Sequence, residues 1–89
     1  MRFRAGIHVT LKPSVLDPQG VAVLHALGSL GFDEVTDVRV GRYIEVRLTA
    51  ADEAAARKRV AAMCETLLAN TVIERYEFTL GDESGEENA

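Results

Sequence analysis

The feature that most constrains this chain is a helix-forming segment, residues 18–30, without a single formally charged side chain. Asp17 stands where an N-cap is expected, and Pro18 occupies the first helical position, where a missing N–H costs nothing. Gly31 supplies the left-handed residue that commonly ends a helix. At about 100° per residue, one face collects the apolar side chains that we expect to pack on the domain's own core: Val23, Leu24, Leu27 and Leu30.

The opposite face of this helix is uncharged as well. It holds small or neutral residues, namely Pro18, Ala22, His25 and Ser29, flanked by Val21 and Gly28. A helix at a protein surface normally carries charged residues such as Lys and Glu on its outer side. We therefore expect a second protein surface to cover this face.

Length and composition indicate one small globular domain. With 89 residues the chain is near the size at which a single core is only marginally sufficient, so association with another chain would help it. No apolar run approaches the roughly 18 residues of a membrane span. The start, Met1 to Arg4, leads directly into alternating residues rather than into a signal-peptide core, and the one cysteine fits a reducing compartment. These features predict a cytoplasmic protein.

The net charge of −4 comes from the end of the chain. Residues 1–80 hold all ten Lys and Arg together with ten of the fourteen acidic residues, so that part is neutral. The other four acidic residues lie in 81–89. We predict a single domain over residues 1–80 and an acidic, disordered tail over 81–89. Neither part has the basic patch typical of nucleic-acid binding.

Hydrophobic patterning predicts the elements around the helix. Strict alternation over residues 3–12 indicates a long, half-buried strand. Val38 and Val40 share one face of a second strand, which forms a hairpin with a third strand over residues 43–48. At the junction, Gly41-Arg42, the glycine fits a tight turn or a bulge equally well. A fourth strand covers residues 72–80.

A second helix lies between the third and fourth strands. Thr49 and Asp52 make a start that resembles a capping box. Its predicted inner stripe is Ala56, Val60, Met63, Cys64 and Leu67. The order is then β-α-β-β-α-β, an α+β ferredoxin-like topology with two helices on one face of an antiparallel sheet.

Residues capable of chemistry are few. Cys64 lies on the inner stripe and reads as a core residue, and His8 and His25 have no partner at metal-ligand spacing. The acidic pairs Asp33-Glu34 and Asp52-Glu53 lie at element boundaries, where turn and cap chemistry explains them. No phosphate-binding glycine motif occurs. We expect no catalytic, cofactor-binding or metal-binding residue on this chain.

Three arginines leave two readings open. Arg39, Arg42 and Arg47 surround the predicted hairpin, where they could meet a phosphate or an acidic partner. Arginines on an exposed strand are also commonly just solvated.

Several segments together resemble a known family. The small PurS subunits of phosphoribosylformylglycinamidine synthase are similar to this sequence in blocks spread over about residues 3–80: 9–13, 16–20, 29–32, Val35, 38–42, 63–65, 67–70, 72–74 and Tyr76. The acidic tail lies outside the resemblance.

The resemblance implies a role in purine biosynthesis. The family's enzyme is a ligase that converts formylglycinamide ribonucleotide to the amidine with ATP and with ammonia from glutamine. It implies that ATP and magnesium bind the separate PurL synthetase subunit and that glutamine is hydrolysed on PurQ. PurS would be a non-catalytic adaptor that bridges the two and supports ammonia transfer. A homodimer is implied, and a tetramer stays open.

Ten residues are the interface candidates. They lie on the uncharged outer helix face and at the projecting turns: Lys12, Pro13, Asp17, Gln19, Ala22, His25, Ser29, Arg39, Gly41 and Arg42. The alternative function is a homo-oligomeric ferredoxin-like module that binds a small regulatory molecule. A free-standing enzyme is disfavoured because no catalytic constellation is present.

Overall fold

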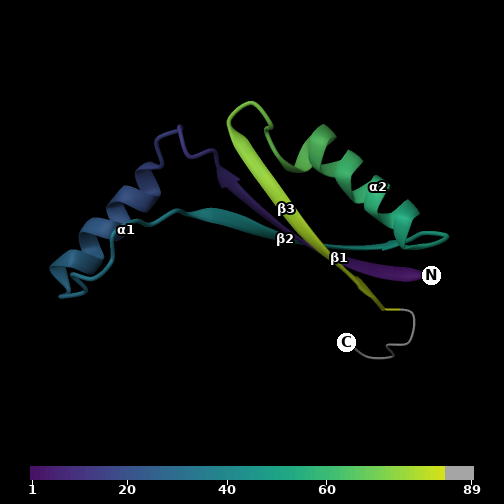
Figure 1. The fold of residues 1–89 in the computed structure, drawn as a ribbon, viewed down its shortest axis with the longest axis horizontal. Coiled ribbons are helices and arrows are strands. Elements are labelled where there is room, and N and C mark those ends of the chain that lie inside the picture. Colours follow the sequence, from purple (N-terminus) through teal and green to yellow (C-terminus); the bar gives the residue numbers. More distant parts are fainter. Residues whose placement is uncertain (84–89) are drawn as a thin grey trace.

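The fold is an antiparallel sheet with one helix packed on it and one helix beyond its end (Figure 1). The computed structural model describes residues 1–83. Within these residues the strands are β1 (Arg2–Leu11), β2 (Gly41–Thr49) and β3 (Glu74–Asp82), and the helices are α1 (Pro18–Ser29) and α2 (Glu53–Met63), the latter continued by a π-helical turn, η1 (Cys64–Leu68). The predicted α+β, ferredoxin-like class is confirmed, with two differences described below.

Strand β1 is the centre of the sheet, which has the order β2-β1-β3. Ile7 lies opposite Ile44 on one side and Phe78 on the other. The predicted alternation is confirmed, since every second residue of β1 is buried on the inner face: Phe3, Ala5, Ile7 and Val9. The inner residues of β2 and β3 are only half-buried, so the core narrows toward both sheet edges.

Helix α2 completes the core on the inner face. Ala56, Val60 and Cys64 are fully buried against the sheet, which confirms the core position predicted for Cys64. The helix starts at the N-cap Asp52, whose carboxylate accepts the Ala55 amide at 2.8 Å. The part predicted for Thr49 in this cap is wrong: Thr49 is the last residue of β2.

The end of α2 departs from regular helical geometry. In η1 the Ala69 amide donates to the Cys64 carbonyl five residues back, at 3.1 Å, so the turn contains one extra residue. That residue rotates the side chains that follow by roughly 100°. Leu67, predicted on the inner stripe, is therefore 80% exposed, and Leu68 takes the half-buried position instead.

The predicted hairpin around Gly41-Arg42 is wrong. Residues 35–40 form no strand, and β2 begins at Gly41 itself, so the sheet of the described residues has three strands rather than four. One reason is that the Val40 amide donates to the Asp17 carboxylate and is not available to a strand partner. Gly41 also lies so close to the Val9 carbonyl oxygen that a side chain there would clash with it.

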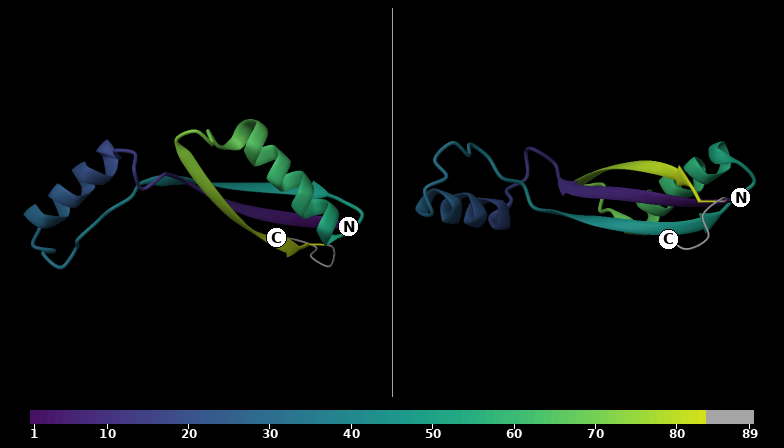
Figure 2. Two further views of the ribbon diagram at one scale, coloured as in Figure 1. Left: turned by 45° about the horizontal axis from the view of Figure 1, so that its top comes forward. Right: turned by 90° about the horizontal axis from the view of Figure 1, so that it is seen from below.

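Helix α1 does not pack on the sheet. Both views in Figure 2 place it beyond the sheet end where β1 finishes and β2 begins. The face predicted to contact the domain's own core is half-buried at Leu24 and Leu27, but Val23 is 40% and Leu30 73% exposed. The own-core prediction for this face is wrong, because the two connections of α1 carry it away from the sheet.

The ordered domain continues past the predicted boundary at residue 80. Strand β3 runs to Asp82, and Glu83 is buried, with ion pairs to Arg4 at 3.4 Å and Arg47 at 3.2 Å. Residues 81–83 are thus part of the fold rather than of a tail. The rest of the predicted tail, residues 84–89, lies outside the described residues. No helix within the described part of the chain is long and apolar enough to cross a membrane.

The central strand should dominate stability. Ile7→Ala removes a fully buried side chain on β1 and is expected to lower the free energy of unfolding by about 2–5 kcal/mol. Chemical denaturation followed by circular dichroism measures this loss. Glu77→Ala on the exposed outer face of β3 is the control and should change the free energy by no more than about 0.5 kcal/mol. Equal losses would contradict the assignment of the core.

Tyr76 reports on the packing of η1 against β3. Its hydroxyl donates to a Glu65 carboxylate oxygen at 2.7 Å, and this bond, with burial and the nearby charge, raises the pKa of Tyr76 to about 12. A phenol whose folded pKa is raised stabilises the fold below its unfolded pKa near 10, and this contribution falls as the pH rises toward 12. Ultraviolet titration should find one of the two tyrosines ionising near 12. Glu65→Ala should lower that pKa, and an unchanged value would refute the contact.

Candidate interaction surface

Helix α1 is an uncharged helix with little covering it. Val21 is 40% exposed on one side, Val23 and Leu30 are exposed on the other, and Phe32 just beyond the helix is 48% exposed. Ala22, His25 and Ser29 are exposed as well, as expected for the outer face. Exposed apolar residues and the absence of charge together make α1 the candidate interaction surface.

A buried carboxylate holds α1 in place. Asp17 is only 6% exposed; one of its oxygens accepts the Gly20 amide at 2.9 Å and the other accepts the Val40 amide at 2.7 Å. The bonds from Val40 and Gly20, in that order, hold the pKa of Asp17 below its usual value, since both favour the ionised form. The predicted N-cap is confirmed, and the same side chain also fastens the segment that leads back to β2.

Arg39 strengthens this attachment from the other side. Its guanidinium donates to the Val15 and Pro13 carbonyls, each at 2.9 Å. Gly20 lies against the Val38 carbonyl oxygen, where a side chain would clash. The contacts of Asp17 and Arg39, called the clamp below, therefore join the connection that enters α1 to the connection that leaves it.

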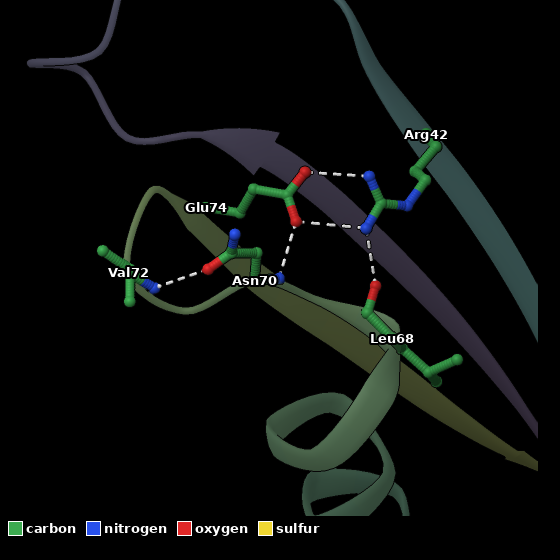
Figure 3. Close-up of polar contacts among 5 residues, drawn as sticks. All are labelled: Arg42, Leu68, Asn70, Val72 and Glu74. Carbon is green, nitrogen blue, oxygen red and sulfur yellow. Dashed lines mark hydrogen bonds and ion pairs between the residues drawn. The ribbon is translucent and has the colours of Figure 1, made fainter.

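Arg42 belongs to a second polar network, at the turn between η1 and β3 (Figure 3). Its guanidinium binds both carboxylate oxygens of Glu74, at 2.8 and 3.1 Å, and donates to the Leu68 carbonyl at 2.7 Å. The same Glu74 carboxylate accepts a hydrogen bond from the backbone amide of Asn70 at 2.7 Å. The Arg42 bond, followed by the Asn70 bond, lowers the pKa of Glu74, and Glu74 in turn raises the pKa of Arg42.

The three arginines thus have intramolecular partners. Arg39 and Arg42 bind the groups just named, and Arg47 pairs with Glu83 at 3.2 Å and with Glu45 at 3.7 Å. The sequence left open whether these side chains are solvated or meet a phosphate or an acidic partner. In the structure each one ties two parts of the chain together.

Groups capable of chemistry are dispersed. Cys64 is buried, and burial followed by the Glu65 charge raises the pKa of its thiol, which disfavours the nucleophilic thiolate. The His8 ring packs on the Tyr43 ring at the outer sheet face, with 4.7 Å between the ring centroids, while His25 is exposed on α1. Among residues 1–83, no three or more His, Cys, Asp or Glu side chains gather where they could hold a metal ion.

Comparison with known proteins identifies the family. Residues 4–82 match the family model PurS, described as phosphoribosylformylglycinamidine (FGAM) synthase. The chain belongs to the PurS family. PurS is a subunit of FGAM synthase, an enzyme of purine biosynthesis.

Individual relatives agree with this assignment. The PurS subunit of Synechocystis is 54% identical over 78 residues, which cover 88% of this chain and 78% of the relative. The solved structure of Bacillus subtilis PurS has a TM-score of 0.77 at 46% identity, covering 90% of this chain and 99% of that one. A chain in the structure of PurLQS from Thermotoga maritima has a TM-score of 0.84 at 30% identity and covers 90% and 98%, respectively.

The ten interface candidates of this PurS-family chain fall into two groups. Five are exposed on α1 or in the loop before it: Pro13, Gln19, Ala22, His25 and Ser29. The other five make contacts within the chain. Lys12 is half-buried, and its backbone amide donates to the Ile73 carbonyl. Asp17 and Arg39 form the clamp, Gly41 lies against β1, and Arg42 binds Glu74. The first group stays the candidate contact surface.

Sequence reasoning missed an apolar groove in this PurS-family fold. It lies between α2 and β2 and has a volume of about 430 Å³, with Val46, Ala62, Met63, Leu67 and Leu68 in its lining. Nothing in the sequence placed Leu67 outside the core, because a π-helical turn leaves no clear signal in hydrophobic periodicity.

Replacing Asp17 should loosen α1 without unfolding the sheet. Asp17→Ala removes the acceptor of two amides, and we expect Gly20 and Val40 to exchange their amide protons roughly tenfold faster. Asp17→Asn is the matched variant: it has one carbonyl oxygen, so it can keep one of the two bonds but not both. Hydrogen-exchange NMR measures each amide separately, and unchanged protection of Val40 in both variants would contradict the clamp.

The clamp should also depend on pH. Because the pKa of Asp17 is lowered in the folded chain, its contribution is fully present above the unfolded value near 3.8 and is lost as the pH falls through the folded pKa. The chemical shift of the Val40 amide should therefore stay constant down to about pH 4 and change only below it. A titration midpoint above 4 would contradict this.

Proposed function

We propose that this chain is the non-catalytic adaptor subunit of FGAM synthase, bridging a PurL synthetase subunit and a PurQ glutaminase subunit. Two observations support the proposal. The chain belongs to the PurS family, and a similar chain is part of the PurLQS structure from Thermotoga maritima. The single observation from the fold that carries it is α1, an uncharged helix that the clamp holds away from the sheet.

The outer face of α1 is suited to a bridging contact. Ala22 and Ser29 have small side chains and Gly28 has none, so another backbone can approach closely, and no charge has to be desolvated on binding. We assign this face, including His25 and the nearby Gln19 and Pro13, to contact with PurL or PurQ.

Ammonia transfer gives a physical reason for a subunit without chemistry of its own. Ammonia released from glutamine is protonated if it equilibrates with water, and the ammonium ion is not a nucleophile. An adaptor that holds two active sites together and excludes water at their junction prevents this loss without any reacting side chain. The dispersed histidines and the buried Cys64 are compatible with such a role.

The proposal also covers the ligands, the oligomeric state and the cellular location. ATP and magnesium bind PurL rather than this chain, glutamine binds PurQ, and the adaptor is a homodimer within the complex. We further propose that the complex works in the cytoplasm, where a single unpaired cysteine stays reduced.

The test is reconstitution of the enzyme from purified PurL, PurQ and this chain, with ATP, magnesium and glutamine. We expect all three chains to elute together and glutamine-dependent FGAM synthesis to require this chain. Ammonium chloride should bypass that requirement, since PurL would carry the synthetase site. Full glutamine-dependent activity of PurL and PurQ alone would overturn the adaptor function.

A charge on the outer face of α1 should separate assembly from folding. Ala22→Glu and Ser29→Glu place a carboxylate on this face, and we expect each to lower glutamine-dependent synthesis at least tenfold while ammonia-dependent synthesis is unchanged. Circular dichroism should show an intact fold. Ala54→Glu, on the exposed first turn of α2, is the matched control and should behave like the native chain. Normal assembly of both α1 variants would exclude this face.

A further inference from the structure

Two arginines on neighbouring strands lie side by side near the start of β1, at the end of the sheet away from α1 (Figure 2). Arg4 of β1 is directly opposite Arg47 of β2. Both belong to the outer face, because the residues on either side of each are the ones that turn toward the core. Like charges that face each other across two strands destabilise the pairing. An anion between the two guanidinium groups therefore stabilises this end of the sheet.

Glu83 supplies that anion, but it satisfies the pair incompletely. It follows the end of β3, where its backbone amide donates to the Arg2 carbonyl at 2.8 Å. Its Oε1 accepts a hydrogen bond from Arg47 Nε at 3.2 Å. Its Oε2 lies 3.4 Å from Arg4 Nε and is buried, yet it has no hydrogen-bond partner among residues 1–83. A buried acceptor without a hydrogen bond destabilises the state that contains it.

The two guanidinium groups keep most of their donors available. A guanidinium has five N–H donors, and Glu83 is paired with the Nε atom of each arginine. The side chains of Arg4 and Arg47 are 42% and 56% exposed. Glu45 lies 3.7 Å from Arg47 Nη2, but it is itself 42% exposed, so water screens the pair.

A phosphoryl group matches this pair of arginines better than a carboxylate does. A phosphate monoester has three acceptor oxygens in a tetrahedral arrangement and a charge of about −2 near neutral pH. It can accept hydrogen bonds from two guanidinium groups at once and offset both positive charges, whereas Glu83 offsets only one. Ion pairs of half-exposed arginines also contribute little stability, so displacement of Glu83 has a small cost.

The surface beside Arg4 is open to a ligand. On the side of Arg4 away from Arg47, the opposite residue of β3 is Gly81, which has no side chain. A side chain built at Gly81 would meet nothing closer than the Arg4 carbonyl oxygen, at 3.9 Å. A tetrahedral anion therefore has space above this part of the sheet.

We propose that Arg4 and Arg47 form a binding site for a phosphoryl group, and that Glu83 occupies this site as an internal substitute when no ligand is bound. Binding displaces the Glu83 carboxylate and releases the end of β3 from Arg2. The ligand is an inorganic phosphate ion or a phosphate monoester. Contact with a phosphate is one of the two readings that the sequence left open for Arg47. The site is independent of the adaptor function, which uses none of these residues.

Removing the charge of Glu83 tests the substitution. Glu83→Gln keeps the length of the side chain but removes the competing carboxylate, so we expect it to bind inorganic phosphate at least tenfold more tightly than the native full-length chain does. NMR titration of the arginine Nε–H resonances measures the affinity, with sodium chloride holding the ionic strength constant. A Glu83 with a purely structural role would give no gain in affinity, and that result would overturn the proposal.

In the native chain, phosphate should release the end of β3. We expect the Glu83 backbone amide to exchange its proton at least tenfold faster at saturating phosphate than in sodium chloride of the same ionic strength. Amides in the middle of β1 should be unchanged, since the core does not take part. Equal exchange of the Glu83 amide in the two salts would contradict the displacement.

Matched variants separate the site from net charge. Arg47→Gln should weaken phosphate binding at least tenfold; if circular dichroism finds it unfolded, Arg4→Gln replaces it. Arg75→Gln and Glu77→Gln make the same charge changes at exposed positions on the outer face of β3 and should leave the affinity within about twofold of the native value. If Glu77→Gln tightens binding as much as Glu83→Gln does, the effect is one of net charge and the site is excluded.

The source of the phosphoryl group follows from comparing inorganic phosphate with glycerol 3-phosphate. Tighter binding of glycerol 3-phosphate would support a phosphorylated metabolite as the ligand, and tighter binding of inorganic phosphate would support the free ion. Binding of neither by the Glu83→Gln chain would overturn the site. Reconstitution of the enzyme with PurL and PurQ tests the adaptor function separately, so the two proposals succeed or fail independently.

Discussion

The position of α1 depends on the buried carboxylate of Asp17. It accepts one amide from the first turn of the helix and another from the segment that enters β2. A single carboxylate with two lone-pair-bearing oxygens can satisfy both, and its ionised form is favoured by doing so. The consequence is that α1 cannot turn back over the sheet. The Val40 amide is thereby withheld from a fourth strand, and the two connections that place α1 beyond the sheet are joined to each other.

The rest of the fold is an ordinary small core around β1. Residues buried on the inner face of the central strand meet Ala56, Val60 and Cys64 of α2, and the charged network of Arg42 and Glu74 closes the turn between η1 and β3. An apolar groove lies between α2 and β2, with the exposed Leu67 in its lining. In this PurS-family chain, apolar side chains are thus buried around β1 and exposed at the groove and on α1.

Surface chemistry and proposed function are consistent with each other. In the described residues, Arg39 and Arg42 each donate hydrogen bonds to backbone carbonyls and so hold connecting segments in place. The surfaces without such a role are neutral or apolar. They suit contacts between proteins, and the proposed function assigns the outer face of α1 to the catalytic subunits.

The sequence by itself determined the local elements. Alternation fixed the face of β1, Asp17-Pro18 and Gly31 fixed the ends of α1, and the family pattern in residues 4–82 identified the chain. These features depend on neighbours a few residues apart, which periodicity and capping describe well. Only the tertiary structure decided where α1 lies, that Val40 bonds to a carboxylate rather than to a strand, and that a π-helical turn exposes Leu67. Each of these depends on a contact between distant residues or on one extra residue in a turn, and an apolar face looks the same in sequence whether its own chain or another covers it.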